Sequence, residues 1–265
     1  MIYLKTEEEI ELMRQSAQIL AKAHAEVAKH VKPGVTTAQL DAIAEAFIRD
    51  HGAIPSFKNY NGFPASLCIS VNEQVVHGIP GNYTLKEGDI VSIDCGVFKN
   101  GFHSDSAYTY AVGEVSEEVR RLLQVTKEAL YKGIEQAVEG NRIGDIGFAI
   151  QHYAQAHGFS IVRQLVGHGI GRSLHEEPEV PNYGKRGKGI KLKEGMVLAI
   201  EPMVNMGKHH IVEEGDGWTI RTADRLPSAH YEHTVVVRKG NAEPLTTFEY
   251  IEQIINQNHG ETTIH

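Results

Sequence analysis

Cysteine and tryptophan are scarce in this sequence of 265 residues, which contains two cysteines and one tryptophan. Cys68 and Cys95 are too few for a disulfide framework, and their spacing is not that of a CxxC pair. We therefore interpret them as free thiols of a protein in a reducing compartment.

Long hydrophobic runs and a basic excess are also missing. No apolar run approaches the roughly 20 residues of a membrane span, and the acidic N-terminus lacks the basic and apolar regions of a signal peptide. The net charge of -8 is opposite to that of a phosphate-binding surface. We expect a cytoplasmic monomer that binds neither membranes nor a nucleic-acid substrate.

The chain contains an internal repeat. Residues 85–94 read LKEGDIVSID and residues 192–201 read LKEGMVLAIE. Upstream, residues 31–52 match residues 138–158, and downstream Asp105 and Glu232 each begin a strand-like run that reaches Gly eight residues later. These matches predict a duplication over approximately residues 6–113 and 115–240, within a single catalytic domain 1–265 that has a polar tail at 251–265.

The repeated unit begins with helical patterns. Thr6 and Glu9 form a capping-box motif before an apolar stripe with helical spacing, which comprises Ile10, Met13, Ala17, Leu20, His24 and Val27. Ser116 precedes the matching stripe of the second copy. The class we predict is α+β, with helices covering curved antiparallel sheets. We expect the two copies to bury matching sheets against each other about a pseudo-two-fold axis.

One hairpin can be placed from the sequence. Asn100-Gly101 is a strong type I′ turn signal, because both central residues of that turn need positive φ. With these residues at the tip, Lys99 pairs with Phe102, and Asp94 pairs with Ala107. Asp105 then lies diagonal to Asp94 on the same face, within reach of a shared ligand.

Duplication places a second acidic pair on the matching face. Asp94, Asp105, Glu201 and Glu232 would then converge, and bound divalent cations would remove their mutual repulsion. His168 lies between two glycines, which we expect to let the backbone approach an ion or ligand. An imidazole among carboxylates favours Mn, Fe, Co or Zn.

The other histidines carry weaker signals. His77 and His175 are equally compatible with a site and with ordinary structural roles. We interpret eight others as surface or half-buried residues, namely His24, His30, His51, His157, His209, His210, His259 and His265, and we place His103 and His233 outside the metal shell.

Five stretches carry a family resemblance over nearly the whole chain. They are CISVNEQVVHGIP (68–80), IVSIDCGVFKNGFHSDSAYTYAVG (90–113), VGHGIGRSLHEEP (166–178), LAIEPMV (198–204) and YEHTVVV (231–237). Together they resemble the type I methionine aminopeptidases of bacteria, a peptidase family with the pita-bread (creatinase/aminopeptidase) fold.

The resemblance implies a metalloexopeptidase. It would remove the initiator methionine from peptides and nascent chains, favour a small second residue and act transiently near the ribosome. Two divalent ions would hold a bridging hydroxide as the nucleophile. By similarity, Asp94 would bind one ion, His168 and Glu201 the other, and Asp105 and Glu232 both.

The same resemblance assigns the remaining roles. Glu201 would be the general base, His175 would stabilise the oxyanion, and His77 would contact the scissile amide nitrogen. The methionine pocket maps onto Phe57, Tyr60, Phe63, Cys68, His77, Leu174 and Trp218. Phe63 and Leu174 stand where the family often has Tyr and Phe.

Two alternatives remain. A prolidase or X-Pro aminopeptidase of the same fold would act on proline substrates, although those enzymes usually carry a further N-terminal domain. A non-catalytic binding protein on this scaffold would be expected to have lost metal ligands, whereas all five are present.

Overall fold

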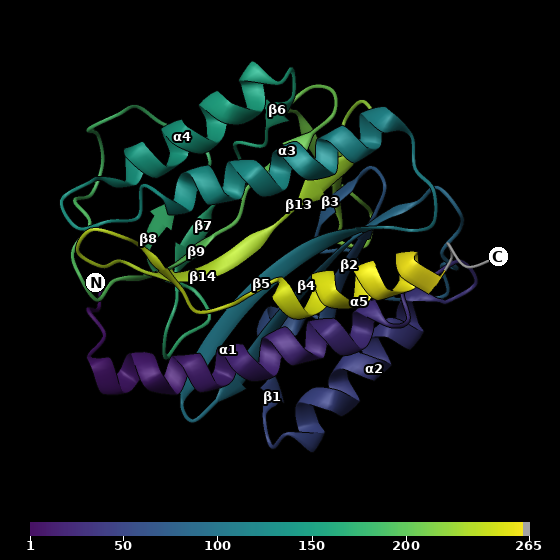
Figure 1. The fold of residues 1–265 in the computed structure, drawn as a ribbon, viewed down its shortest axis with the longest axis horizontal. Helices are drawn as coiled ribbons and strands as arrows, with labels where there is room; N and C mark the ends of the chain where they lie inside the picture. The colour runs from purple at the N-terminus through teal and green to yellow at the C-terminus, as the bar shows by residue number, and fades with distance from the viewer. Residues whose placement is uncertain (262–265) are drawn as a thin grey trace.

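The computed structural model describes residues 1–261, with side chains to residue 257. Two units with the same element order follow each other along the chain (Figure 1). The first contains α1 (Glu7–Ala28), α2 (Thr37–Asp50), β4 (Ile90–Lys99) and β5 (Phe102–Ala111). The second contains α3 (Glu117–Ile134), α4 (Ile143–Ala156), β9 (Val197–Ile200) and β14 (Glu232–Val236). This order is the one that the predicted duplication requires.

Shorter elements complete the chain. The remaining strands are β1 (Ile54–Pro55), β2 (Leu67–Val71), β3 (Gln74–Val76), β6 (Ser160–Ile161), β7 (Gly167–Gly169), β8 (Glu176–Val180), β10 (Met203–Asn205), β11 (Ile211–Glu213), β12 (Ile220–Thr222), β13 (Ser228–His230) and β15 (Glu243–Pro244). A 3₁₀ turn, η1, spans Tyr60–Gly62, and α5 spans Glu249–Glu261. Part of the predicted polar tail is therefore helical. Residues 262–265 lie outside the described residues, as do the side chains of His259 and His265.

The two units share one sheet. Its strand order is β1-β4-β5-β14-β9-β7-β8, with β2 also on β4 and β15 also on β14. The units meet where β5 pairs with β14 antiparallel, with Glu232 opposite Ala107. The expectation that two matching sheets bury against each other is therefore wrong. Edge-to-edge pairing satisfies the backbone groups of both central strands and still places the repeats side by side.

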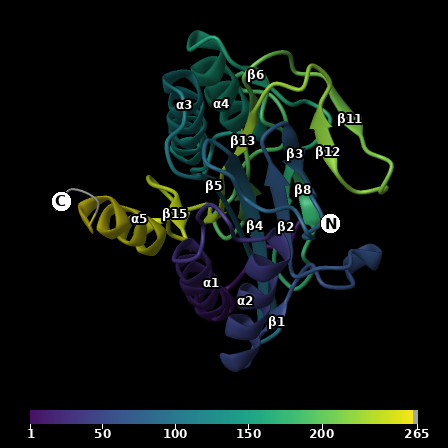
Figure 2. The same cartoon turned by 90° about the vertical axis from the view of Figure 1, so that its right-hand side faces the viewer.

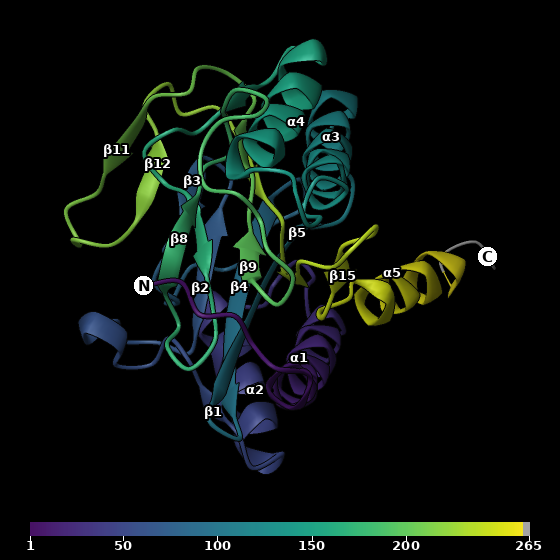
Figure 3. The same ribbon diagram turned by 90° about the vertical axis from the view of Figure 1, so that its left-hand side faces the viewer.

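The main helices lie on one face of this sheet, and β11 and β12 lie beyond the other (Figures 2 and 3). A core of apolar residues from the helices and the sheet fills the first interface. A second cluster contains Ile10, Met13, Phe57, Phe63 and Leu174. The α+β class with helices covering a curved antiparallel sheet is confirmed.

The first helix begins as its sequence predicts. The side chain of Thr6 accepts from the backbone N–H of Glu9, whose carboxylate accepts from the N–H of Thr6 in return. All six residues of the predicted stripe are buried. His24 is one of them, so our interpretation of His24 as a surface or half-buried residue is wrong. Its Nε2 lies 2.9 Å from the carbonyl oxygen of Ser106, which lets a neutral imidazole sit in the core.

The first hairpin has the predicted register. Asn100 and Gly101 have φ of 53° and 83°, Lys99 pairs with Phe102, and Asp94 pairs with Ala107. Asp105 follows two positions from Ala107 on the same face, so the alternation of the pleat alone brings the first acidic pair together. Among the described residues, no helix is long and apolar enough to cross a membrane.

Candidate metal centre and substrate pocket

The central strands of the sheet bring four acidic residues to one place. Asp94 lies on β4, Asp105 on β5, Glu232 at the start of β14, and Glu201 directly after β9. Asp105 and Glu232 are 3% and 1% exposed. The first acidic pair lies on the β4–β5 hairpin and the second lies much later in the chain, and the β5–β14 pairing is what joins the two pairs.

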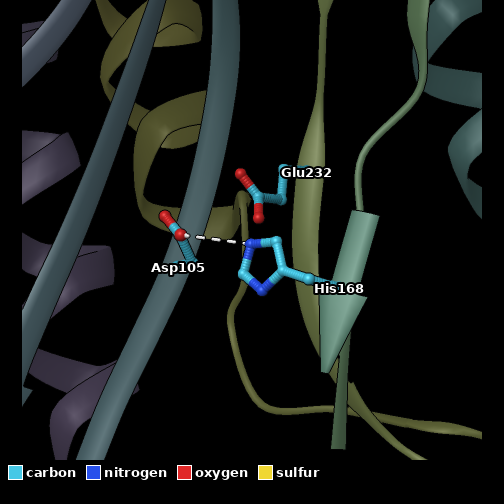
Figure 4. Close-up of side chains that lie close together, drawn as sticks. All are labelled: Asp105, His168 and Glu232. Atoms are coloured by element: carbon cyan, nitrogen blue, oxygen red, sulfur yellow. Dashed lines mark ion pairs between the residues drawn. The ribbon is translucent and has the colours of Figure 1, made fainter. Parts of the chain in front are cut away.

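His168 joins this group from β7 (Figure 4). Its Nδ1 lies 2.9 Å from the carbonyl oxygen of Gly169 and donates to it, which leaves Nε2 facing the acids. Nε2 is 3.5 Å from Glu201 Oε1 and 3.9 Å from Asp105 Oδ2. Asp105, His168 and Glu232 offer ligand atoms within 4.8 Å of one another.

The glycines beside His168 have a different purpose from the one we expected. A Cβ on Gly167 would collide with the carbonyl oxygen of Ala199 on β9, and one on Gly169 would collide with that of Glu177 on β8. The glycines therefore allow close approach of neighbouring strands. They still position His168, because they let β7 lie between β8 and β9.

Burial disfavours the ionised forms of the four acidic residues. It raises the pKa of Asp94 to about 7 and that of Glu201 to about 8. Burial, with the charges of neighbouring carboxylates added, raises the pKa of Asp105 and of Glu232 well above the usual range. Burial also lowers the pKa of His168 to about 3, so this imidazole is neutral at pH 7 and free to act as a ligand.

The donor set fits divalent cations. In the part of the chain that the structure describes, Asp94 Oδ1, Asp105 Oδ1 and Glu232 Oε1 are buried and have no hydrogen-bond partner. Such oxygens are costly unless something positive satisfies them. Bound cations would satisfy these oxygens, and a mixed set of carboxylates and imidazole suits transition-metal ions.

The same cavity contains every predicted substrate residue. Its volume is about 380 Å³. Its predicted lining residues are Phe57, Tyr60, Phe63, Cys68, His77, Leu174, His175 and Trp218, together with the five acidic and histidine residues of the centre. Phe63 and Trp218 form an edge-to-face pair at 5.2 Å. Residues of both units thus line one cavity, in which an apolar slot adjoins the carboxylates.

Two further histidines lie at this slot. His175 Nδ1 is 2.7 Å from the Tyr60 hydroxyl, and its ring centroid is 4.2 Å from that of His168. His77 has a left-handed φ of 61°, a conformation that a residue with a Cβ adopts only when its surroundings hold it there. Burial lowers the pKa of His77 to about 4 and, to a smaller extent, that of His175, so both imidazoles are neutral at pH 7.

Several lining residues were not predicted from the sequence. They are Asn61, Val76, Gln164, Leu165, Val166 and Met203. His230 was also missed, although its Nε2 lies 3.4 Å from Glu201 Oε2. The signal was available: His230 precedes Glu232 by two positions, and strand alternation places such residues on the same face.

A buried donor set of this kind, beside an apolar slot, is typical of a metalloenzyme. A family model described as metallopeptidase family M24 matches residues 11–239. The chain belongs to metallopeptidase family M24 and, within it, to the methionine aminopeptidases.

Similar proteins agree with this placement. A methionine aminopeptidase of Clostridium perfringens is 58% identical over 246 residues, which cover 93% of this chain and 99% of that protein. The crystal structure of methionine aminopeptidase from Rickettsia prowazekii has a TM-score of 0.92 and 45% identity, covering 93% of this chain and 100% of that one. A prolidase from Pyrococcus furiosus has a TM-score of 0.75 and 25% identity, covering 92% of this chain and 65% of that one.

Proposed function

We propose that this chain removes the N-terminal methionine from peptides and nascent proteins with a small second residue, using two divalent cations. One observation carries the proposal: the acidic centre and the apolar slot belong to a single cavity of about 380 Å³. A slot that ends at the reactive centre accommodates one side chain, which favours an exopeptidase. Its apolar walls suit the flexible thioether of methionine.

The cations would be held by Asp94, Asp105, His168, Glu201 and Glu232. When bound, divalent cations depress the pKa of coordinated water and so supply a nucleophile at neutral pH. Support for cation binding comes from Asp105, His168 and Glu232, whose possible ligand atoms lie within 4.8 Å of one another. Co, Mn, Fe and Zn all suit this donor set.

Glu201 is our candidate for the general base. Its carboxyl group lines the cavity beside the other proposed cation ligands, where a bound substrate would lie. His175 is our candidate for stabilising the oxyanion. When the Tyr60 hydroxyl donates to His175 Nδ1, the proton of the neutral ring resides on Nε2 and can be donated to a developing negative charge. His77 would hydrogen-bond the scissile amide nitrogen.

We further propose how the domain arose and where the protein acts. The recurring order of helix, helix, strand and strand supports a single catalytic domain built by duplication. The family resemblance implies action in the cytoplasm, on chains emerging from the ribosome, and we expect the protein to act as a monomer.

Peptide hydrolysis tests the function. We expect release of methionine from Met-Ala-Ser with added Mn²⁺ or Co²⁺, loss of activity after thorough chelation, and little hydrolysis of Gly-Pro. Activity on Gly-Pro alone would replace the proposal with the prolidase alternative. Glu201→Gln keeps the shape of the side chain and should lower kcat by 10²–10⁴-fold, the range of a general base. Full activity of Glu201→Gln would contradict the role of Glu201.

A further inference from the structure

His230 is a buried imidazole in this centre to which the steps above give no role. It is the last residue of β13 and is 1% exposed. Its Nε2 has no hydrogen-bond partner among the described residues. A buried ring nitrogen without a partner is costly, so its persistence beside the acids needs a physical reason.

The position of Glu201 supplies that reason. His168 Nε2 is 3.5 Å from Oε1 of Glu201, and His230 Nε2 is 3.4 Å from Oε2. The carboxylate is thus bracketed by two imidazoles, one toward each oxygen. Contacts of this length tighten when an active site is assembled around its ligands.

The two imidazoles differ in what they can do. His168 donates its Nδ1–H to a backbone carbonyl, so its Nε2 presents a lone pair toward the metal ligands. His230 Nε2 faces an oxygen of the Glu201 carboxyl group, which can only accept a hydrogen bond once it is ionised, as binding of a cation requires. A favourable contact therefore requires the proton of His230 to be on Nε2, which makes this nitrogen a donor and not a ligand.

The backbone of His230 is held firmly. Its N–H donates to the Thr109 hydroxyl at 2.9 Å, and that hydroxyl lies 2.7 Å from the His230 carbonyl oxygen. His230 also pairs with Met203 on β10. These contacts tie β13 to β5 and β10, so the ring projects from a rigid frame, as a residue that orients another side chain must.

We propose that His230 is a positioning residue, which donates Nε2–H to Glu201 Oε2 and fixes the plane of that carboxylate. The opposite oxygen, Oε1, is thereby kept on the side of His168 and the metal ligands. This inference rests on the proposed function for its kinetic consequence. Residues that orient metal ligands in this way typically change affinity or activity by about 10–100-fold when removed.

Two substitutions separate positioning from packing. His230→Gln retains an N–H donor of similar reach, whereas His230→Leu retains bulk without a donor. We expect His230→Leu to lower kcat on Met-Ala-Ser about 10–100-fold with KM changed less than about threefold, and His230→Gln to recover most of the loss. His24→Leu, which replaces another buried imidazole, is the control for a general effect on folding. Equal kcat values for His230→Leu and wild type would overturn the proposal.

A second measurement does not depend on activity. In zinc-loaded protein labelled with ¹⁵N-histidine, the His230 signals are identified by their absence in His230→Gln. We expect the Nε2–H tautomer and an unchanged zinc stoichiometry in His230→Leu. An Nδ1–H tautomer, or loss of one zinc ion in His230→Leu, would show a ligand and overturn the positioning role. If wild type fails to cleave Met-Ala-Ser, the proposed function fails, and the tautomer still decides the role of His230.

Discussion

Lys5 and Glu176 form a buried ion pair between the N-terminal segment and the loop that carries His175. Lys5 Nζ lies 2.6 Å from Glu176 Oε2, and the side chains are 5% and 7% exposed. Glu176 Oε1 also accepts from the backbone N–H of Ser173. A residue before the first helix thus holds the strand segment that begins directly after His175.

Breaking this pair should destabilise the protein strongly. Lys5→Met keeps the apolar stem but leaves the Glu176 charge buried and uncompensated, which typically costs about 3–5 kcal/mol. The matched control is Arg172→Met, because the Arg172–Glu9 pair at 3.1 Å is solvent-exposed at its arginine and should contribute no more than about 1 kcal/mol. Urea unfolding measures both. Similar losses for the two variants would show that burial of the Lys5–Glu176 pair does not matter.

Cation binding should stabilise the folded chain. At a free Mn²⁺ concentration 100 times Kd, the free energy of unfolding should rise by about 2.7 kcal/mol, since the assembled centre exists only in the folded state. Asp105→Asn should abolish this rise and stabilise the metal-free protein, because it removes one of the mutually repelling carboxylates. Thermal unfolding with Mn²⁺ and with a chelator measures both effects.

Asp89 is the matched control for this prediction. Its buried carboxylate accepts from Asn72 Nδ2, the Tyr83 hydroxyl and the backbone N–H of Lys86, and it belongs to no group of possible metal ligands in the described part of the chain. Asp89→Asn should lower stability with or without Mn²⁺ and leave the size of the Mn²⁺ effect unchanged. An Mn²⁺ effect that survives in Asp105→Asn would place the cation elsewhere.

Acid should weaken the fold through His24. Burial lowers the pKa of His24 to about 4 from the ordinary value of 6.5. The unfolded chain therefore binds more protons between these values, and stability falls as pH drops from about 6.5 to 4, by roughly 3 kcal/mol in all. His24→Gln can still donate to the Ser106 carbonyl but does not titrate. Unfolding midpoints between pH 7 and 4 should decline less steeply in His24→Gln, whereas the exposed His51→Gln should follow wild type.

Leu174 should set the fit of the methionine slot. It is 2% exposed and lines the cavity. Leu174→Ala should lower kcat/KM for Met-Ala-Ser at least about tenfold, relative to a peptide that begins with the bulkier phenylalanine, because lost apolar contacts weaken binding of the smaller side chain. Leu40→Ala in α2 also removes a buried leucine, so it should lower stability by about 2–5 kcal/mol. It should not change the ratio of the kcat/KM values for the two peptides. A shift in the ratio for Leu40→Ala would refute a local effect.

The sequence predicts local structure correctly wherever neighbouring residues determine it. The capping box at Thr6 and Glu9 needs four residues, and the hairpin at Asn100-Gly101 needs two with positive φ. From that turn, strand alternation determines that Asp94 and Asp105 share a face. These features depend on short-range sterics and hydrogen bonding, which the sequence displays directly.

The sequence does not predict the role of a residue correctly where that role depends on partners distant in the chain. The glycines beside His168 accommodate Ala199 and Glu177, which no local pattern reveals. His24 carries a polar ring, and only the carbonyl of Ser106 on β5 makes its burial acceptable. The spacing of His230 to Glu232 is visible in the sequence, but its contact with Glu201 joins the end of β13 to the residue after β9, which no local pattern reveals.

The acidic centre shows the same difference between features set by neighbouring residues and features set by distant ones. The sequence alone determined which acids belong together in each half, since turn chemistry and the two-residue period of a strand act within one hairpin. Only the tertiary structure decided how the halves meet: β5 pairs with β14, and this edge brings Asp105 beside Glu232. That choice depends on packing and backbone pairing across more than a hundred residues, which no local periodicity encodes.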